Sequence, residues 1–179
     1  HGQDLPQLIN RLGAKSILLS AQKLPPEGLS SLYNAAGCTI NISDAEGFGL
    51  ATLESLSCGT PIIVNMTGGL QEQVTDGENY FGVGIEPASS VVIGSQQVPY
   101  ICEDRVAKKD FIEALHKIYN INKKERKKII KLGKEHIKKN YNFADFEKRW
   151  VDLMLNVHKK YGSWEDRKHY LAWDCLEMK

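Results

Sequence analysis

The feature that most constrains the fold is a strand–loop–helix–strand segment between residues 38 and 65. The apolar runs at 38–42 and 61–65 are typical of buried strands, and the glycines between them indicate a tight turn into a short helix. Such a segment is part of a βαβ unit, in which ligands bind at the carboxyl ends of the parallel strands. The sequence therefore predicts an α/β fold, with a Rossmann-like parallel sheet flanked by helices and a ligand site at residues 43–49, here called the glutamate loop.

Two carboxylates, Glu46 and Glu54, bracket the turn. Gly47 and Gly49 allow close approach of the backbone to a ligand, and the N–H groups at the helix start favour phosphate. Eight helical residues rise about 12 Å, close to the span between the two sugars of a nucleoside-diphosphate sugar. One carboxylate for each sugar is therefore predicted. Spacing alone favours a plainer alternative, in which the helix dipole attracts acids whatever the function.

The remaining pattern indicates alternating helices and strands, followed by helices only. Tyr100 and Trp150 are predicted to lie in the core, and the helix after Pro25 is predicted to bury Leu32. The chain is interpreted as one domain, 1–179, with a core at 1–122 and C-terminal helices at 123–179. The expected helices cover 3–12, 25–37, 50–58, 70–74, 106–119, 123–140, a segment capped by Asn142, and a short one from Ser163. A strand is expected at 16–20, and either a hairpin or an extended excursion at 91–101.

Charge and cysteine content limit the partners. The net charge of +1 gives no reason to expect a nucleic acid, and four scattered cysteines fit a cytoplasmic protein. The basic stretch 123–139 is either the solvated face of a helix or a contact with acidic phospholipid. The histidines at 116, 136, 158 and 169 are interpreted as surface residues without a metal or catalytic role.

Several motifs in order resemble the family 4 retaining glycosyltransferases of the GT-B fold. The central one is E-G-F-G-L from Glu46, completed by Glu54, which resembles the E-x7-E signature of that family. Ser43 stands where the family has a serine before the first glutamate. Further resemblance covers residues 1–87 and is carried by the motifs at 4–13, 29–36, 58–61 and 68–77.

The resemblance implies the donor-binding, C-terminal half of a GT-B enzyme that transfers a sugar from a nucleoside diphosphate without a required metal or other cofactor. Glu46 would bind donor-sugar hydroxyls as the catalytic residue, and Glu54 would bind the ribose. The backbone around Gly47, Phe48, Gly49 and Leu50 would hold the sugar or diphosphate. The base would contact the loop Gln22, Lys23 and Leu24.

Departures from the family pattern leave alternatives open. The family's cationic diphosphate ligands and its N-terminal acceptor domain precede the stretch that matches residue 1, so the isolated chain is expected to be inactive. The acceptor is left open between a saccharide and a lipid-linked molecule. Segment 88–104 is longer than in the family. Other classes considered are a non-catalytic nucleotide-sugar-binding or interaction module and a sugar-nucleotide epimerase. A dehydrogenase is disfavoured because no G-x-G-x-x-G follows a strand.

Overall fold

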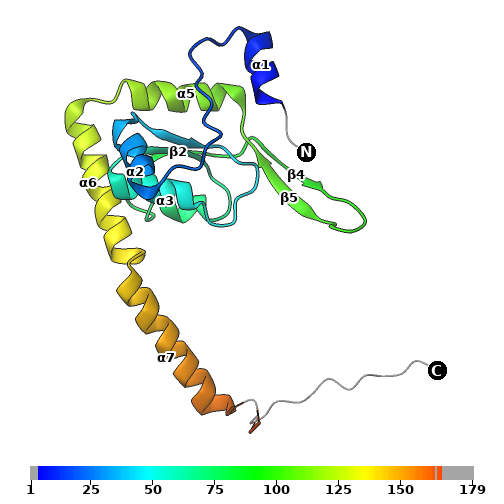
Figure 1. Cartoon of the computed structure of the whole chain (residues 1–179), viewed down its shortest axis with the longest axis vertical. Coiled ribbons are helices and arrows are strands. Elements are labelled where there is room, and N and C mark those ends of the chain that lie inside the picture. The colour runs from blue at the N-terminus through cyan, green and yellow to red at the C-terminus, as the bar shows by residue number, and fades with distance from the viewer. Residues whose placement is uncertain (1–3, 164, 167–179) are drawn as a thin grey trace.

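The computed structural model describes residues 4–163 and 165–166. Its described part contains a parallel three-stranded sheet, an antiparallel hairpin and helices on both sides of the sheet (Figure 1). In chain order the elements are α1 Leu5–Leu12, α2 Pro26–Ala35, β1 Thr39–Asn41, α3 Leu50–Cys58, β2 Ile62–Asn65, α4 Leu70–Val74, β3 Gly82–Ile85, β4 Ser89–Ile93, β5 Ile101–Arg105, α5 Lys108–Tyr119, α6 Lys123–Asn140 and α7 Phe143–Tyr161.

The sheet has the order β1-β2-β3, and every residue of the central strand β2 is buried. Its two faces carry separate cores because successive β2 side chains point to opposite sides. Ile62 and Val64 pack with Leu56 of α3 and Leu70 of α4, whereas Ile63 packs against α5. α6 covers the first face from outside, over α3. The expected α/β class is confirmed.

Strand β3 was not predicted, because two of its four residues are glycine and glycine is depleted in strands. The close packing of the sheet explains these two glycines, because a side chain at either position would not fit. A Cβ at Gly82 would overlap the carbonyl of Ile62 on the neighbouring strand, and one at Gly84 would overlap the thioether of Met66. These positions therefore select glycine for close packing, a requirement that propensity does not reveal.

The strand expected at 16–20 was wrong. This stretch has no strand partner in the described part of the chain, and Leu18 is 95% exposed. A strand requires a hydrogen-bonded neighbour, and β1 pairs only with β2 within the described residues. The burial expected for α2 was also wrong in part, because Leu32 is exposed.

The expected hairpin is confirmed as β4 and β5, paired from Ser89–Arg105 to Ile93–Ile101. It extends away from the sheet as a separate arm (Figure 1). Tyr100, expected in the core, lies at this arm with 83% of its surface exposed and a φ of +61°. The prediction failed because an aromatic residue next to apolar neighbours indicates a core only where another layer covers it.

The C-terminal helices begin where expected. The Asn142 side chain accepts a hydrogen bond from the Asp145 N–H (2.9 Å) and caps α7. Trp150 is not a core residue, because α7 stands away from the sheet and buries none of its side chains (Figure 1). None of the helices α1 to α7 combines the length and the hydropathy that a membrane-spanning segment requires. The last expected helix, from Ser163, lies almost wholly outside the described residues.

Candidate functional site

The glutamate loop joins the end of β1 to the start of α3. Gly49, the residue before the helix, has a φ of +82°, a left-handed conformation that costs a residue with a Cβ about 1–2 kcal/mol. A Cβ at this position would also lie 2.6 Å from a methyl group of Leu70. The chain therefore turns into α3 tightly against α4.

A second loop, at Gly68 and Gly69 and here called the glycine loop, packs against the glutamate loop. A Cβ on Gly68 would overlap the carbonyl oxygen of Glu46, and the Gly69 N–H donates to the Gly47 carbonyl at 3.2 Å. The fully buried Gln73 of α4 donates its amide to the Phe48 carbonyl. The two loops thus form one unit, and contacts from residues far along the chain determine the course of the glutamate loop.

Glu46 is half-buried and oriented by its neighbours. The side-chain amide of Asn41 donates to the Glu46 carboxylate at 3.3 Å, and the Ser43 hydroxyl donates to the side-chain Oδ1 of Asn41 at 2.7 Å. Ser43, predicted to contact the donor, therefore has a further contact in the structure, since it orients the residue that holds Glu46. The pattern of the sequence did not reveal Asn41 as part of this chain of contacts.

Glu54 lies on α3 and borders a cavity of about 360 Å³ between α2, α3 and α6. The Tyr33 hydroxyl donates to its carboxylate at 2.9 Å. Partial burial, followed by this hydrogen bond and the negative charge of Glu54, raises the pKa of Tyr33 to about 12. Because Glu54 accepts this bond through one oxygen, its second oxygen remains as an acceptor. The cavity is lined by Pro26, Leu29, Ser30, Tyr33, Leu50, Leu53, Glu54, Ser57, Cys58, Ile137 and Tyr141.

Replacing Tyr33 by Phe should change the alkaline stability of the protein. The raised folded-state pKa means that the phenol contributes stability below its unfolded pKa of about 10. That contribution is lost as pH rises from there through about 12. Chemical denaturation at pH 8 and pH 11 should therefore show a smaller loss of unfolding free energy with pH in Tyr33→Phe than in the wild type. Equal losses would contradict the Tyr33–Glu54 contact, and the exposed Tyr119, changed to Phe, is the matched control.

The other predicted residues lie around this cavity and loop. Leu50 borders the cavity and is exposed, whereas Phe48 is partly exposed with its ring 6.0 Å from that of Tyr141. A Cβ at Gly47 would meet nothing within 4 Å, so the backbone there is open to a ligand. The predicted base-contact residues Gln22, Lys23 and Leu24 precede the helix that carries Pro26 but do not line the cavity.

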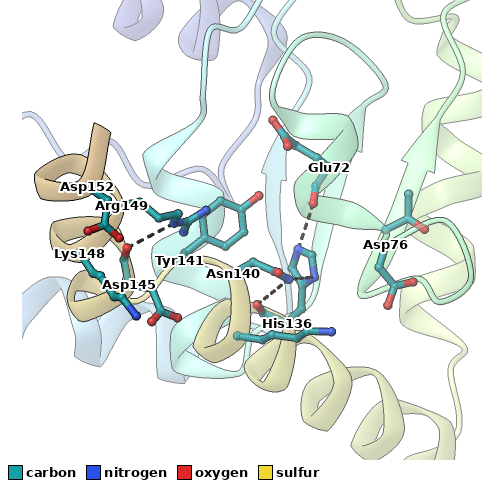
Figure 2. Close-up of a pocket in the computed structure, with 11 residues that line it drawn as sticks. Glu72, Asp76, His136, Asn140, Tyr141, Asp145, Lys148, Arg149 and Asp152 are labelled. Carbon is teal, nitrogen blue, oxygen red and sulfur yellow. Dashed lines mark hydrogen bonds between the residues drawn. The ribbon is translucent and has the colours of Figure 1, made fainter. Parts of the chain in front are cut away.

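A larger hollow of about 890 Å³ lies beside the site, between α4 and the junction of α6 with α7 (Figure 2). It contains neither Glu46 nor Glu54 among its lining residues. At its wall, His136 contacts the Glu72 carbonyl through Nε2 (3.0 Å) and the Asn140 amide through Nδ1 (3.0 Å). A neutral ring with its proton on Nε2 satisfies both contacts.

His136 was expected on a polar surface, and this was wrong. Its ring is half-buried, 4.5 Å from the ring of Phe81 and 5.6 Å from that of Tyr141. It thereby joins α6 to α4. His116 and His158 are exposed as expected, and His169 lies outside the described residues.

Comparison with known proteins identifies the family. The profile of the family described as "Glycosyl transferases group 1" matches residues 4–136. D-inositol 3-phosphate glycosyltransferases from Acidothermus cellulolyticus and Kribbella flavida are 44% and 38% identical to this chain over 78 and 77 residues. Each match covers 43% of this chain, and 17% and 18% of the relative.

A solved structure shares the fold. Sucrose-phosphate synthase from Thermosynechococcus elongatus superposes with a TM-score of 0.67, at 21% identity, over 87% of this chain and 34% of that one. At this identity the likeness concerns the fold alone. The family profile matches most of the chain, including the glutamate loop and the glycine loop that packs against it. This chain therefore belongs to the group 1 glycosyl transferases.

Proposed function

We propose that this chain binds a nucleoside-diphosphate sugar as the donor for glycosyl transfer with retention of the anomeric configuration. The observation that carries the proposal is the placement of Glu54 on a cavity next to the start of α3, with Glu46 oriented at the other side of the same turn. Membership of the group 1 glycosyl transferases supports the reaction class. The cavity is within the size range of small-ligand pockets.

Each part of the site has a separate role in this proposal. Glu46 accepts hydrogen bonds from donor-sugar hydroxyls, and Glu54 accepts them from the ribose through its second oxygen. The open backbone at Gly47 allows the donor to approach, while the N–H groups at the start of α3 face the diphosphate. The base lies toward Gln22, Lys23 and Leu24, which precede α2.

Catalysis in this proposal consists of orientation and charge stabilisation by these groups. The bond between the anomeric carbon and the diphosphate oxygen breaks, and the oxygen of the acceptor hydroxyl forms its bond on the same face of the sugar. The proton of that hydroxyl passes to the departing diphosphate oxygen, and the nucleoside diphosphate leaves. Negative charge developing on the leaving diphosphate is stabilised by fixed N–H dipoles. The acceptor, a saccharide or a lipid-linked molecule, is bound by a separate GT-B acceptor domain. The relatives' names, D-inositol 3-phosphate glycosyltransferase, are consistent with a polyol or sugar acceptor.

Calorimetric titration with UDP, GDP and ADP tests the donor site. At least one nucleotide should bind, and Glu54→Ala should weaken it about 10- to 100-fold, because charged hydrogen bonds contribute about 1.5–3 kcal/mol. Glu113→Ala is the matched control, since Glu113 is an exposed acid on α5, at the opposite face of the sheet. The proposal fails if none of the three binds, or if Glu54→Ala binds as tightly as the wild type.

A further inference from the structure

The base of the β4–β5 hairpin, residues 89–90 and 104–105, contacts the glutamate loop, although Arg105 and Asp44 are 61 residues apart in the chain. We infer that this base is a clamp that positions the first half of the glutamate loop, residues 43–46, and with it Glu46. Thr67 and Asp104 are then positioning residues for the donor sugar. The functional part of this inference rests on the proposed function, whereas the clamp itself is testable without any ligand.

The first set of contacts involves the backbone of the loop. The Asp104 N–H donates to the Asp44 carbonyl at 2.7 Å. The side-chain amide of Asn65, at the end of β2, donates to the carbonyls of Ser43 (2.9 Å) and Asp104 (2.7 Å). Strand end, loop and hairpin base therefore meet at one amide.

Asn65 retains this orientation at a cost. Its side chain is fully buried, and its Oδ1 has no hydrogen-bond partner among the described residues. A buried acceptor without a partner costs about 1–3 kcal/mol. Rotating the amide would place that oxygen against two carbonyl oxygens and lose both donated bonds. The bonds to Ser43 and Asp104 therefore determine the orientation of the side chain.

The second set of contacts joins the hairpin to the glycine loop. The buried Thr67 donates its hydroxyl to one oxygen of the Asp104 carboxylate (2.7 Å), and Ser90 donates to the other. These two bonds lower the pKa of Asp104. Thr67 directly precedes Gly68, whose backbone lies against the Glu46 carbonyl. Asp104 thus fixes the hairpin to both loops of the site.

A peripheral ion pair adds to the clamp. Arg105 contacts the Asp44 carboxylate at 2.7 Å, with side-chain exposures of 47% and 40%. Exposed pairs of this kind contribute about 0–1 kcal/mol. The positioning is therefore assigned to the buried hydroxyl of Thr67, the carboxylate of Asp104 and the amide of Asn65 rather than to this pair.

The loop depends on such tethers because it has no regular structure of its own. Between the end of β1 at Asn41 and the start of α3 at Leu50 the chain forms neither strand nor helix. A site on a loop holds its geometry only when surrounding contacts fix it. The tip of the hairpin, residues 94–99, makes none of the clamp contacts given above, so base and tip have separable roles.

Hydrogen exchange of the free protein tests the clamp. Thr67→Val keeps the shape of the side chain and removes its hydroxyl, and Thr67→Ser restores the hydroxyl. The Ser43 N–H donates to Asn41 Oδ1 at 3.2 Å, and the Asp104 N–H donates to the Asp44 carbonyl at 2.7 Å. Both amides should exchange about 10-fold faster in Thr67→Val and Asp104→Ala, since losing one such bond destabilises the closed loop by about 1 kcal/mol or more. Thr67→Ser should exchange like the wild type, and amides of β2 should be unchanged in all variants.

The control is Ser95→Ala, which removes the hydrogen bond from the Val98 N–H to the Ser95 hydroxyl at the tip (3.1 Å) and should leave exchange of the Ser43 and Asp104 amides unaltered. Unchanged exchange of the Ser43 and Asp104 amides in Thr67→Val and Asp104→Ala overturns the clamp. Faster exchange in β2 as well assigns these residues to general stability and likewise overturns it.

Ligand binding tests the consequence for the donor. Titration with UDP-glucose, GDP-mannose and ADP-glucose, compared with UDP, GDP and ADP, separates sugar contacts from nucleotide contacts. Thr67→Val should weaken the nucleotide sugar that binds about 5- to 10-fold and the corresponding nucleotide less than about 2-fold, because Glu46 belongs to the loop and Glu54 to α3. Equal weakening of both would overturn the assignment to the sugar. If the wild type binds none of the six, the proposed function fails, whereas the exchange result still decides the clamp.

Discussion

Gly68→Ala is expected to weaken donor binding at least 10-fold and to destabilise the fold. Gly68 has a φ of +48°, and a Cβ there would overlap the carbonyl oxygen of Glu46. A left-handed residue other than glycine costs about 1–3 kcal/mol, and overpacking costs about 1–3 kcal/mol more. The overlapping group is backbone, so the glutamate loop itself must move. Calorimetry should show at least a 10-fold loss of affinity for the nucleotide sugar that the wild type binds.

Thermal unfolding provides the second measurement for this variant. A loss of about 3 kcal/mol corresponds to a midpoint about 6–12 °C lower in a chain of this size. Gly47→Ala is the control for stability, because a Cβ at Gly47 meets nothing within 4 Å. A Gly68→Ala protein with the midpoint of the wild type would contradict the packing of the two loops.

Gly82→Ala is expected to reduce stability by a comparable or larger amount, for a different reason. Gly82 is paired with Ile62 in the parallel ladder, and a Cβ would overlap the Ile62 carbonyl. Strands β2 and β3 would have to separate where the core is fully buried. We expect a loss of at least about 3 kcal/mol, measured by chemical denaturation, with the m-value unchanged.

Binding distinguishes the two glycine variants. Gly82 lies at the start of β3, whereas the site forms at the opposite, carboxyl ends of the strands. The fraction of Gly82→Ala that folds should therefore bind nucleotide with the affinity of the wild type. Gly37→Ala serves as the control, since nothing lies within 4 Å of its Cβ position. A stable Gly82→Ala protein would contradict the register of the sheet.

The sequence was informative where the determinant is local. Helix α3 was predicted at its observed bounds, 50–58, because Leu50 follows a glycine and Gly59 ends the helix. The Asn142 cap of α7 was predicted for the same kind of reason. The likeness of the motifs around Glu46 and Glu54 to a known family then identified the class, which the comparisons confirm. The roles assigned to these two residues remain predictions.

The sequence was uninformative where a contact joins distant segments. Tyr33 meets Glu54 across 21 residues, and Thr67 meets Asp104 across 37. Neither spacing has a period that a helix or strand would produce. For Leu18 and Trp150 the sequence predicted burial, and both residues are exposed. Each lies in a pattern typical of buried residues, but burial also requires a covering layer from another part of the chain. Propensity and periodicity report the surface that a segment offers, not its partner.

The convergence of three segments on Asn65 has a consequence for the order of folding. The sheet and α3 are joined by contacts over short separations, such as Ser55 to Thr39 across 16 residues. The glutamate loop, by contrast, is fixed through bonds from Asn65 and Arg105 that link segments up to 61 residues apart. Because closing long segments slows folding, we predict that β1, β2 and α3 assemble before these bonds form. We therefore expect Glu46 to reach its final position late in folding, after the hairpin has docked.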